Sequence, residues 1–204
     1  MTVAPTIQTN PAASRRVGAL LARAFHDDAM FCAVQPDAER RRRVLPWFFA
    51  AAARLGMREG EVHVLEEDAG AAIWLPPGDG RLRARAIVRS GLALVPLRFG
   101  PSAFRRFARI TGGFDSVREQ VVYQPYWHLF ILGVAPGRQG RGLGGELIAP
   151  VLARADQAGQ RCYLETSEER NLPFYERHRF AVAGGRRNPD GAPPFWPMVR
   201  QPAG

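Results

Sequence analysis

The chain has 204 residues, 46% of them hydrophobic, which is enough to bury the core of one globular domain. Its 28 basic residues are all arginines and give a formal net charge of +9, which suits an anionic ligand carrying several phosphates. A general bias towards arginine explains this charge more simply than selection for binding nucleic acid or a membrane, so the composition predicts neither partner.

The cysteines and the N-terminal segment argue against two further classes, metalloproteins and secreted proteins. Cys32 and Cys162 are the two cysteines, and neither has the Cys-x-x-Cys or histidine spacing of a metal site. We therefore expect no metal and two reduced thiols in the core. An apolar stretch follows Arg16, but Arg23 and Asp27 interrupt it too early for a signal peptide. A cytoplasmic protein is predicted.

The first part of the chain predicts a short strand and two helices. Residues 5–8 have the pattern of a strand, and apolar side chains recur at helical spacing over residues 17–25. A second helix is expected over residues 38–55, with its run ERRRR as a solvated face.

The middle of the chain predicts a β-hairpin followed by a helical segment. Residues 61–65 and 71–75 are two strand-like runs separated by a short acidic turn. Residues 80–124 are longer than a simple connection and rich in arginine, and the prolines and glycine within residues 96–101 split them into short helices.

The C-terminal part predicts an alternation of strands and helices. Residues 127–134 are almost continuously apolar, as a central strand buried on both faces would be. A helix follows, with an apolar stripe from Leu143 to Ala155. The last elements expected are a strand at 161–165, a short helix at 172–178 and strands at 180–183 and 195–199.

The segment LGVAPGRQGRGLGG, residues 132–145, joins the apolar strand to this helix through a glycine-rich loop. A helix N-terminus presents unpaired backbone N–H groups and partial positive charge, so such a loop can bind a diphosphate. A P-loop is excluded because the chain contains no lysine. Residues 140–145 match the dinucleotide fingerprint G-x-G-x-x-G, with Glu165 at about the expected distance. However, five residues separate this match from the strand, and too little chain follows for a doubly wound sheet.

A third kind of loop fits better. The run QGRGLG, residues 139–144, has the form Q/R-x-x-G-x-G/A and resembles the acetyl-CoA loop of the GNAT superfamily of N-acetyltransferases. Residues 163–180, YLETSEERNLPFYERHRF, resemble the next strand and helix of that superfamily, with Asn171 and Tyr175 at characteristic positions. Within the superfamily, the segments LETSEERNLPFYER and AAIWLPPG are most similar to the puromycin N-acetyltransferase type.

The resemblance implies an α/β fold for the whole chain, residues 1–204, as a single GNAT-like domain. Its central sheet would be mixed but mostly antiparallel, with about six to seven strands flanked by helices. The sheet would splay between the strands at 127–134 and 161–166. Residues 80–124 would form a helical insertion over the acceptor site.

The same resemblance implies acetyl-CoA as cosubstrate and assigns residues to it. Backbone groups of Leu132 and Val134 would hold the pantetheine as an added strand does, and the Val134 amide would polarise the thioester carbonyl. Asn171 would contact the coenzyme arm, and it also suits a helix N-cap. The loop residues expected to bind the diphosphate are Arg138, Gln139, Gly140, Arg141, Gly142, Leu143 and Gly144.

Amide formation also requires proton transfers, because an alkyl ammonium is protonated at neutral pH. By the resemblance, Tyr175 would donate a proton to the departing sulfur, the alternative being a packed core tyrosine. Glu165 and His128 are the candidates for the base, although Glu165 could instead pair with an arginine and His128 could be a satisfied core residue. Asp27 and Asp28 would either attract a cationic acceptor or form a cap or turn.

One position departs from the superfamily pattern. Arg179 stands just before Phe180, where the superfamily usually has glycine. Glycine there permits a positive φ or close packing, so arginine predicts a changed turn near Tyr175.

Together these features predict an enzyme that transfers acetyl to the primary amine of a small molecule in a ternary complex. Direct transfer is expected because neither cysteine lies in a nucleophile motif. Two alternatives stay open: an acyl-CoA-binding regulatory module without turnover, and a basic nucleic-acid-binding protein. Puromycin-like aminonucleosides are a hypothesis for the acceptor. A homodimer is compatible with the sequence.

Overall fold

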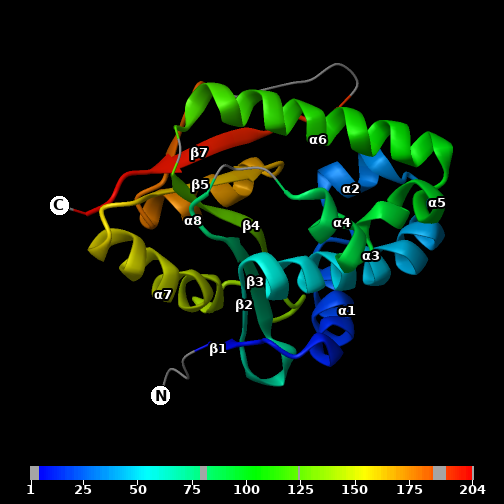
Figure 1. The fold of residues 1–204 in the computed structure, drawn as a ribbon, viewed down its shortest axis with the longest axis horizontal. Helices are drawn as coiled ribbons and strands as arrows, with labels where there is room; N and C mark the ends of the chain where they lie inside the picture. Colours follow the sequence, from blue (N-terminus) through cyan, green and yellow to red (C-terminus); the bar gives the residue numbers. More distant parts are fainter. Residues whose placement is uncertain (1–4, 79–81, 124, 186–191, 204) are drawn as a thin grey trace.

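A mixed sheet of seven strands crosses the described part of the chain, which comprises residues 5–78, 82–123, 125–185 and 192–203 of this computed structural model (Figure 1). The strand order is β1-β2-β3-β4-β5-β7-β6. The strands are β1 (Thr6–Ile7), β2 (Glu61–Val64), β3 (Gly70–Leu75), β4 (Tyr126–Val134), β5 (Arg161–Thr166), β6 (Ala181–Val182) and β7 (Trp196–Arg200). Because β4 and β5 are parallel and the other neighbours antiparallel, the predicted mixed sheet is confirmed.

Helices cover both faces of the sheet (Figure 1). On one face α1 and α3 pack against the central strands, with α2 and α4 to α6 around them, and on the other face lie α7 and α8. Their bounds are α1 (Ser14–Ala24), α2 (Ala29–Val34), α3 (Ala38–Glu59), α4 (Ala84–Ser90), α5 (Val95–Phe99), α6 (Pro101–Val121), α7 (Leu143–Gln157) and α8 (Leu172–Arg177). The α/β architecture expected from the sequence, a mixed sheet flanked by helices, is therefore confirmed.

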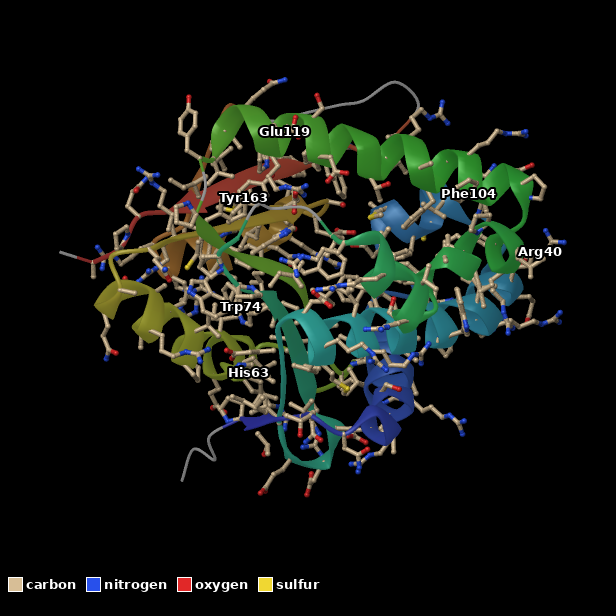
Figure 2. The ribbon with its side chains drawn as sticks, viewed as in Figure 1. Arg40, His63, Trp74, Phe104, Glu119 and Tyr163 are labelled. Atoms are coloured by element: carbon tan, nitrogen blue, oxygen red, sulfur yellow. The ribbon has the colours of Figure 1, made fainter. Side chains whose placement is uncertain are left out.

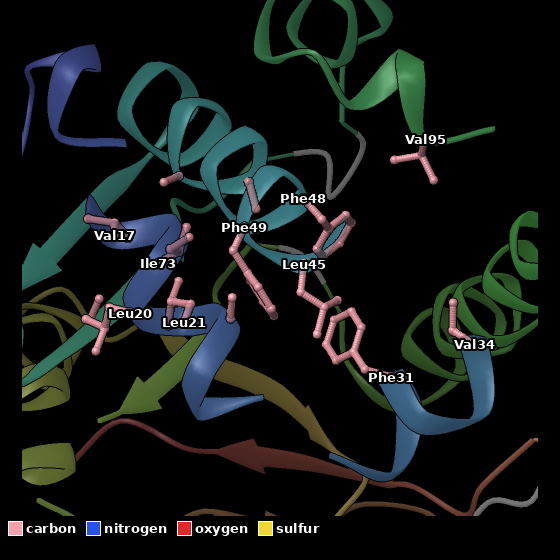
Figure 3. Packing of buried hydrophobic residues seen from close by; sticks show 14 of the residues in the cluster. Val17, Leu20, Leu21, Phe31, Val34, Leu45, Phe48, Phe49, Ile73 and Val95 are labelled. Carbon is pink, nitrogen blue, oxygen red and sulfur yellow. The ribbon is translucent and has the colours of Figure 1, made fainter. Parts of the chain in front are cut away.

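The core under α1 and α3 is aromatic. Figure 3 shows Phe31, Phe48 and Phe49 gathered between α2 and α3, and the rings of Phe31 and Phe49 have centroids 5.1 Å apart. Gly18 lets α1 approach α3 closely, since a Cβ there would lie 2.6 Å from the Pro46 carbonyl oxygen. This layer gives the sheet a rigid backing on one side.

The opposite core is built by the apolar stripe of α7. Leu147, Ile148 and Val151 are fully buried against Trp74 of β3, which Figure 2 labels at the centre of the molecule. Tyr175 of α8 belongs to the same cluster. The helical spacing of these residues in the sequence is therefore the spacing of a buried face.

The strands β4 and β5 separate after a short parallel contact. Their pairing covers Tyr126 to His128 on β4, and β4 then continues to Val134 paired with β3 alone. A bulge at Phe130 interrupts the register between β3 and β4. The predicted splay is confirmed. It also explains why Phe130 and Leu132 are half-buried where a strand buried on both faces was expected.

Two helices differ from the sequence expectation. Residues 29–34 form α2, which the apolar pattern did not predict. This helix begins after Asp28, whose side chain caps it by accepting hydrogen bonds from the Met30 and Phe31 amides. The segment after Pro101 is one helix of 21 residues rather than a further short piece. Proline occupies its first turn, where a missing N–H costs nothing.

The run ERRRR in α3 is not wholly solvated. Arg41 is buried, and its guanidinium donates to the backbone carbonyls of His26, Gln35 and Pro36 at 2.8 to 2.9 Å. This arginine therefore holds the loops that flank α2, and the prediction of a solvated face is wrong at this position.

Candidate functional site

The loop between β4 and α7 has the backbone of an anion cradle. Gly137, Gly140 and Gly142 have φ values of 79°, 77° and 82°, in the left-handed region that favours glycine. Gly142 is also the N-cap of α7, and a Cβ on it would meet nothing within 4 Å. The glycines are therefore required by the backbone conformation, and the space above them stays open.

Backbone donors converge in this loop. Within the described residues, six successive amides donate to no acceptor, namely those of Gln139, Gly140, Arg141, Gly142, Leu143 and Gly144. Arg141 is exposed and pairs with no described carboxylate, whereas Arg138 donates to Glu67 at 2.6 Å. Gln139 turns back and its side-chain nitrogen lies 3.3 Å from the Val134 carbonyl oxygen. Free amides at a helix N-terminus are suited to bind phosphate oxygens.

The edge of β4 presents a second set of donors. The Ala135 amide donates to the Ala69 carbonyl at 2.9 Å, so Val134 and Gly70 form a non-hydrogen-bonded pair of the antiparallel ladder. The backbone N–H of Val134 therefore points away from β3, towards the gap left by β5. Leu132, two residues earlier, has the same orientation. These are the two residues that the sequence assigned to the pantetheine.

The start of α7 touches α8 closely. A Cβ on Gly144 would lie 3.0 Å from the Phe174 ring, and one on Gly145 would lie 3.1 Å from His178. This contact brings the loop next to Tyr175, whose ring packs edge-on against Phe174 with centroids 5.0 Å apart. Tyr175 lies in the core as the alternative interpretation expected. Burial first, and then the charge of Asp28, raise its pKa, so its hydroxyl stays protonated.

Two other predicted residues near α8 have specific local roles. Asn171 stands at the N-cap position, but its side chain does not cap the helix and instead donates to Thr166 Oγ1 at 3.3 Å. Arg179 adopts φ 68°, the left-handed conformation that glycine would supply. Its amide donates to the Glu176 carbonyl and the Phe180 amide donates to Tyr175, as in a Schellman turn. The prediction of a changed turn is therefore wrong.

His128 and Glu165 meet across β4 and β5. Their side chains are 37 residues apart in the sequence, and His128 Nε2 lies 2.9 Å from Glu165 Oε2. The other carboxylate oxygen is 3.7 Å from the guanidinium of Arg118 on α6. The two candidates for the base therefore form one hydrogen-bonded pair. Glu165 also contacts an arginine, as the alternative interpretation expected.

Tyr163 lies beneath this pair. Its ring centroid is 5.4 Å from that of His128, and the side chain is fully buried. Burial first, and then the charge of Glu165, raise the pKa of Tyr163. Burial lowers the pKa of Arg118, but the charges of Glu165 and Asp115 raise it by more, so the pKa lies above its usual value. The His128–Glu165 pair therefore lies beside a tyrosine that stays neutral and an arginine that stays charged.

A cavity of about 980 Å³ opens beside His128. Residues from α3, α4, α5 and α6 line it together with the beginning of β4. Sequence reasoning placed residues 80–124 near the acceptor but did not name the residues that face it. The signal was present, since residues 104, 107, 111, 115 and 118 of α6 recur at helical spacing and all line the cavity.

The aspartates after α1 are divided between two roles. Asp28 caps α2, and Glu168 reaches the same helix end by accepting from the Ala29 amide at 3.0 Å. Burial, with a smaller effect from Glu168, raises the pKa of Asp28 to about 6. Asp27 is exposed and lies 3.7 Å from Arg41.

Metal and membrane features were searched in the described residues. No group of three or more His, Cys, Asp or Glu side chains there could hold a metal ion. None of the helices in these ranges combines the length and the apolar character needed to cross a bilayer.

Comparison with protein families and curated proteins shows similarity to acetyltransferases. The sequence model of the acetyltransferase (GNAT) family matches residues 107–180, which include the loop, β5 and α8. An uncharacterized N-acetyltransferase of Schizosaccharomyces pombe is 26% identical over 172 residues, covering 81% of this chain and 70% of that protein.

Solved structures share the fold over almost the whole chain. A Corynebacterium glutamicum protein, described as histone acetyltransferase HPA2 and related acetyltransferase, has a TM-score of 0.64 at 21% identity, with 99% of this chain and 98% of that chain covered. Arylalkylamine N-acetyltransferase 2 of Aedes aegypti has a TM-score of 0.60 at 13% identity, with coverages of 97% and 98%. The polyamine N-acetyltransferase of Drosophila melanogaster, which forms N-acetylagmatine, has 0.57 at 15%, with coverages of 97% and 99%.

Proposed function

We propose that this chain belongs to the GNAT superfamily of acetyltransferases and transfers an acetyl group from acetyl-CoA to the primary amine of a small molecule without a covalent enzyme intermediate. One observation carries the proposal: the unpaired edge of β4 runs from the His128–Glu165 pair beside the cavity to the six unbonded amides of the loop. A thioester held along this edge would have its acetyl group near the cavity and its diphosphate at the loop.

The residues present fit the coenzyme. The amides of residues 139–144 and the exposed guanidinium of Arg141 suit the diphosphate, and the open space at Gly142 admits it. The amides of Leu132 and Val134 would pair with the pantetheine as a strand does. Arg138 would have to leave Glu67 to contribute. Bound there, acetyl-CoA supplies the activated acetyl group.

His128 and Glu165 are proposed to handle the proton of the amine. When Nε2 of His128 donates to the Glu165 carboxylate, Nδ1 is the nitrogen that accepts the proton. Glu165 then acts as a positioning residue that selects this tautomer and stabilises the charged ring. Arg118, 3.7 Å from Glu165, places a positive charge beside this carboxylate.

Tyr175 is proposed to protonate the departing sulfur. It belongs to the core beneath α7 and α8, whereas His128 lines the cavity on the other side of the sheet, so base and acid would work from opposite faces of the splay. Its raised pKa keeps the hydroxyl protonated as an acid requires.

Release of free CoA thiol across a panel of primary amines tests the activity, and isothermal titration tests coenzyme binding. We expect His128→Gln to lower kcat/KM about 10²-fold to 10⁴-fold and Tyr175→Phe to lower kcat about 10²-fold, both with the coenzyme affinity of the natural protein. His26→Gln, outside the cavity lining, is the matched control and should keep full turnover. Coenzyme binding with no turnover of any amine would favour a regulatory module instead. Unchanged turnover in Tyr175→Phe would remove Tyr175 from its role.

Puromycin-like aminonucleosides are the narrower proposal for the acceptor. It is supported by the resemblance of AAIWLPPG, whose Leu75 lines the cavity. Mass spectrometry of puromycin incubated with the protein and acetyl-CoA should show one added acetyl group. If puromycin stays unmodified while other amines are acetylated, the narrower proposal fails.

A further inference from the structure

The cavity is polarised along α6. Phe104 and Phe107 line it from the first part of this helix, and Asp115, Arg118 and Glu119 line it from the last part. Figure 2 shows Phe104 and Glu119 towards opposite ends of α6. At about 1.5 Å per residue, Phe107 and Asp115 are about 12 Å apart along the axis. The cavity therefore has an apolar end and a charged end separated by the length of a small molecule.

The apolar end is an aromatic cluster. The ring of Phe48 has its centroid 5.6 Å from that of Phe107 and 5.6 Å from that of Phe99. Aliphatic side chains from α4, α5 and the turn between them complete this end, namely Ile87, Leu92, Ala93 and Val95. In the described part of the lining, every charged side chain belongs to the opposite end, so a second ammonium placed among these rings would find no carboxylate.

The charged end carries a net negative charge, because three carboxylates lie there with one arginine. Asp115 accepts from Arg118 at 2.5 Å, and the same guanidinium lies 3.7 Å from Glu165. Arg118 thus offsets part of the negative charge of these two carboxylates, and Glu119 adds a third carboxylate to the lining. Because His128 lies at this end, an ammonium attracted here arrives beside the proposed base.

We infer that the acceptor is an amphipathic monoamine, with its single amino group at the Asp115–Glu119 end and an aliphatic or aromatic tail along α6 towards Phe48 and Phe107. This inference rests on the proposed function and narrows it to a substrate class. It excludes polyamines as good substrates, because their second ammonium would lose its hydration at the aromatic end without a partner.

A matched pair of acceptors tests the inference on the natural protein. Octylamine and 1,8-diaminooctane have the same length and differ by the distal ammonium. We expect kcat/KM for octylamine to exceed that for the diamine at least about 100-fold, and kcat/KM for n-alkylamines from propyl to octyl to rise about threefold to fourfold per methylene, about 0.8 kcal/mol each. Equal or preferred use of the diamine would overturn the inference while leaving the acetyltransferase proposal intact. No thiol release with any amine would overturn both.

Thr111, midway along the cavity face of α6, supplies a second test. Its hydroxyl bonds back to the Phe107 carbonyl at 3.0 Å, and a phenylalanine there blocks the path of the tail. We expect Thr111→Phe to lower kcat/KM for octylamine at least about tenfold more than kcat/KM for propylamine. The control is Ser116→Phe, which adds the same ring at an exposed position of α6 outside the lining and should leave both values unchanged. Equal losses for both amines in a folded Thr111→Phe protein would contradict the inference. If that variant fails to fold, the comparison of the two acceptors decides.

Discussion

Arg179 is an arginine in a conformation that usually belongs to glycine. Its φ of 68° costs a residue with a Cβ about 1 to 2 kcal/mol. Two backbone hydrogen bonds hold it there: its own amide donates to Glu176 and the Phe180 amide donates to Tyr175. The end of α8 is therefore fixed by the fold around Tyr175 and tolerates an unfavourable side chain.

Replacing this arginine by glycine relieves the strain. We expect Arg179→Gly to raise the free energy of unfolding by about 1 kcal/mol, since part of the gain is offset by the greater entropy of glycine in the unfolded chain. Urea denaturation of both proteins measures the difference. A variant no more stable than the natural protein would mean that the turn carries no strain.

The short helix α2 depends on carboxylates from two distant parts of the chain. Asp28 and Glu168 both accept backbone amides of its first turn, and they are brought together by the packing of α2 beside the segment after β5. The helix has six residues, too few to be stable alone, so the caps and its buried Phe31 hold it. The negative charge of Asp28 is the unfavourable part of this arrangement, because burial and Glu168 oppose its ionisation.

This charge makes stability depend on pH. The pKa of Asp28 is raised from 3.8 to about 6, so the folded state holds the proton more tightly. The associated stability is present below about pH 4 and is lost as the pH rises through about 6. Asparagine caps a helix as well as aspartate does, so we expect Asp28→Asn to be more stable by about 1 to 3 kcal/mol at pH 7.5 and equal at pH 4. Urea melts across this range measure it, and a constant difference at all pH values would contradict the explanation.

Arg200 ties together the elements behind the splay. It forms two hydrogen bonds from β7 to Asp156 of α7, at 2.7 and 2.6 Å, and one to the His178 carbonyl after α8. The same carboxylate accepts the Ala203 amide at 2.7 Å. Residues near the end of β7 are thereby connected to α7, the helix whose N-terminus forms the proposed anion cradle. These bonds, those of Arg200 above all, lower the pKa of Asp156 to about 2.

Breaking this connection should destabilise the fold. Asp156→Asn leaves the buried Arg200 without its charge partner, and we expect the free energy of unfolding to fall by about 2 to 4 kcal/mol at pH 7. Because the folded pKa is depressed, the contribution is present above about pH 4 and is lost as the pH falls through about 2. The control is Asp68→Asn, whose pair with the exposed Arg16 should contribute less than about 1 kcal/mol. Thermal or urea melts that show an equal loss of stability in the two variants would contradict this account.

Local features could be predicted from the amino-acid order. The loop of residues 139–144 follows from its glycines, and the strands and helices around it follow from the period of apolar residues, because these depend on backbone sterics and on which face of an element is apolar. His128 and Glu165 were recognised as candidates for the same reason, since each lies on a well-marked strand. The end of α8 was mispredicted because the turn conformation is held by long-range packing rather than by the residue itself.

The meeting of distant groups could not be predicted in this way. His128 bonds Glu165 because β4 and β5 run parallel in a register that pairs His128 with Tyr163. Arg118 reaches them from α6, and α2 is capped from 139 residues away by Glu168. Such contacts depend on how sheets and helices pack in three dimensions, whereas a periodic pattern carries information only about neighbours along the chain. The glycine loop of residues 139–144 could therefore be predicted from the sequence, whereas the proposed base and the polarised cavity form only when the chain folds.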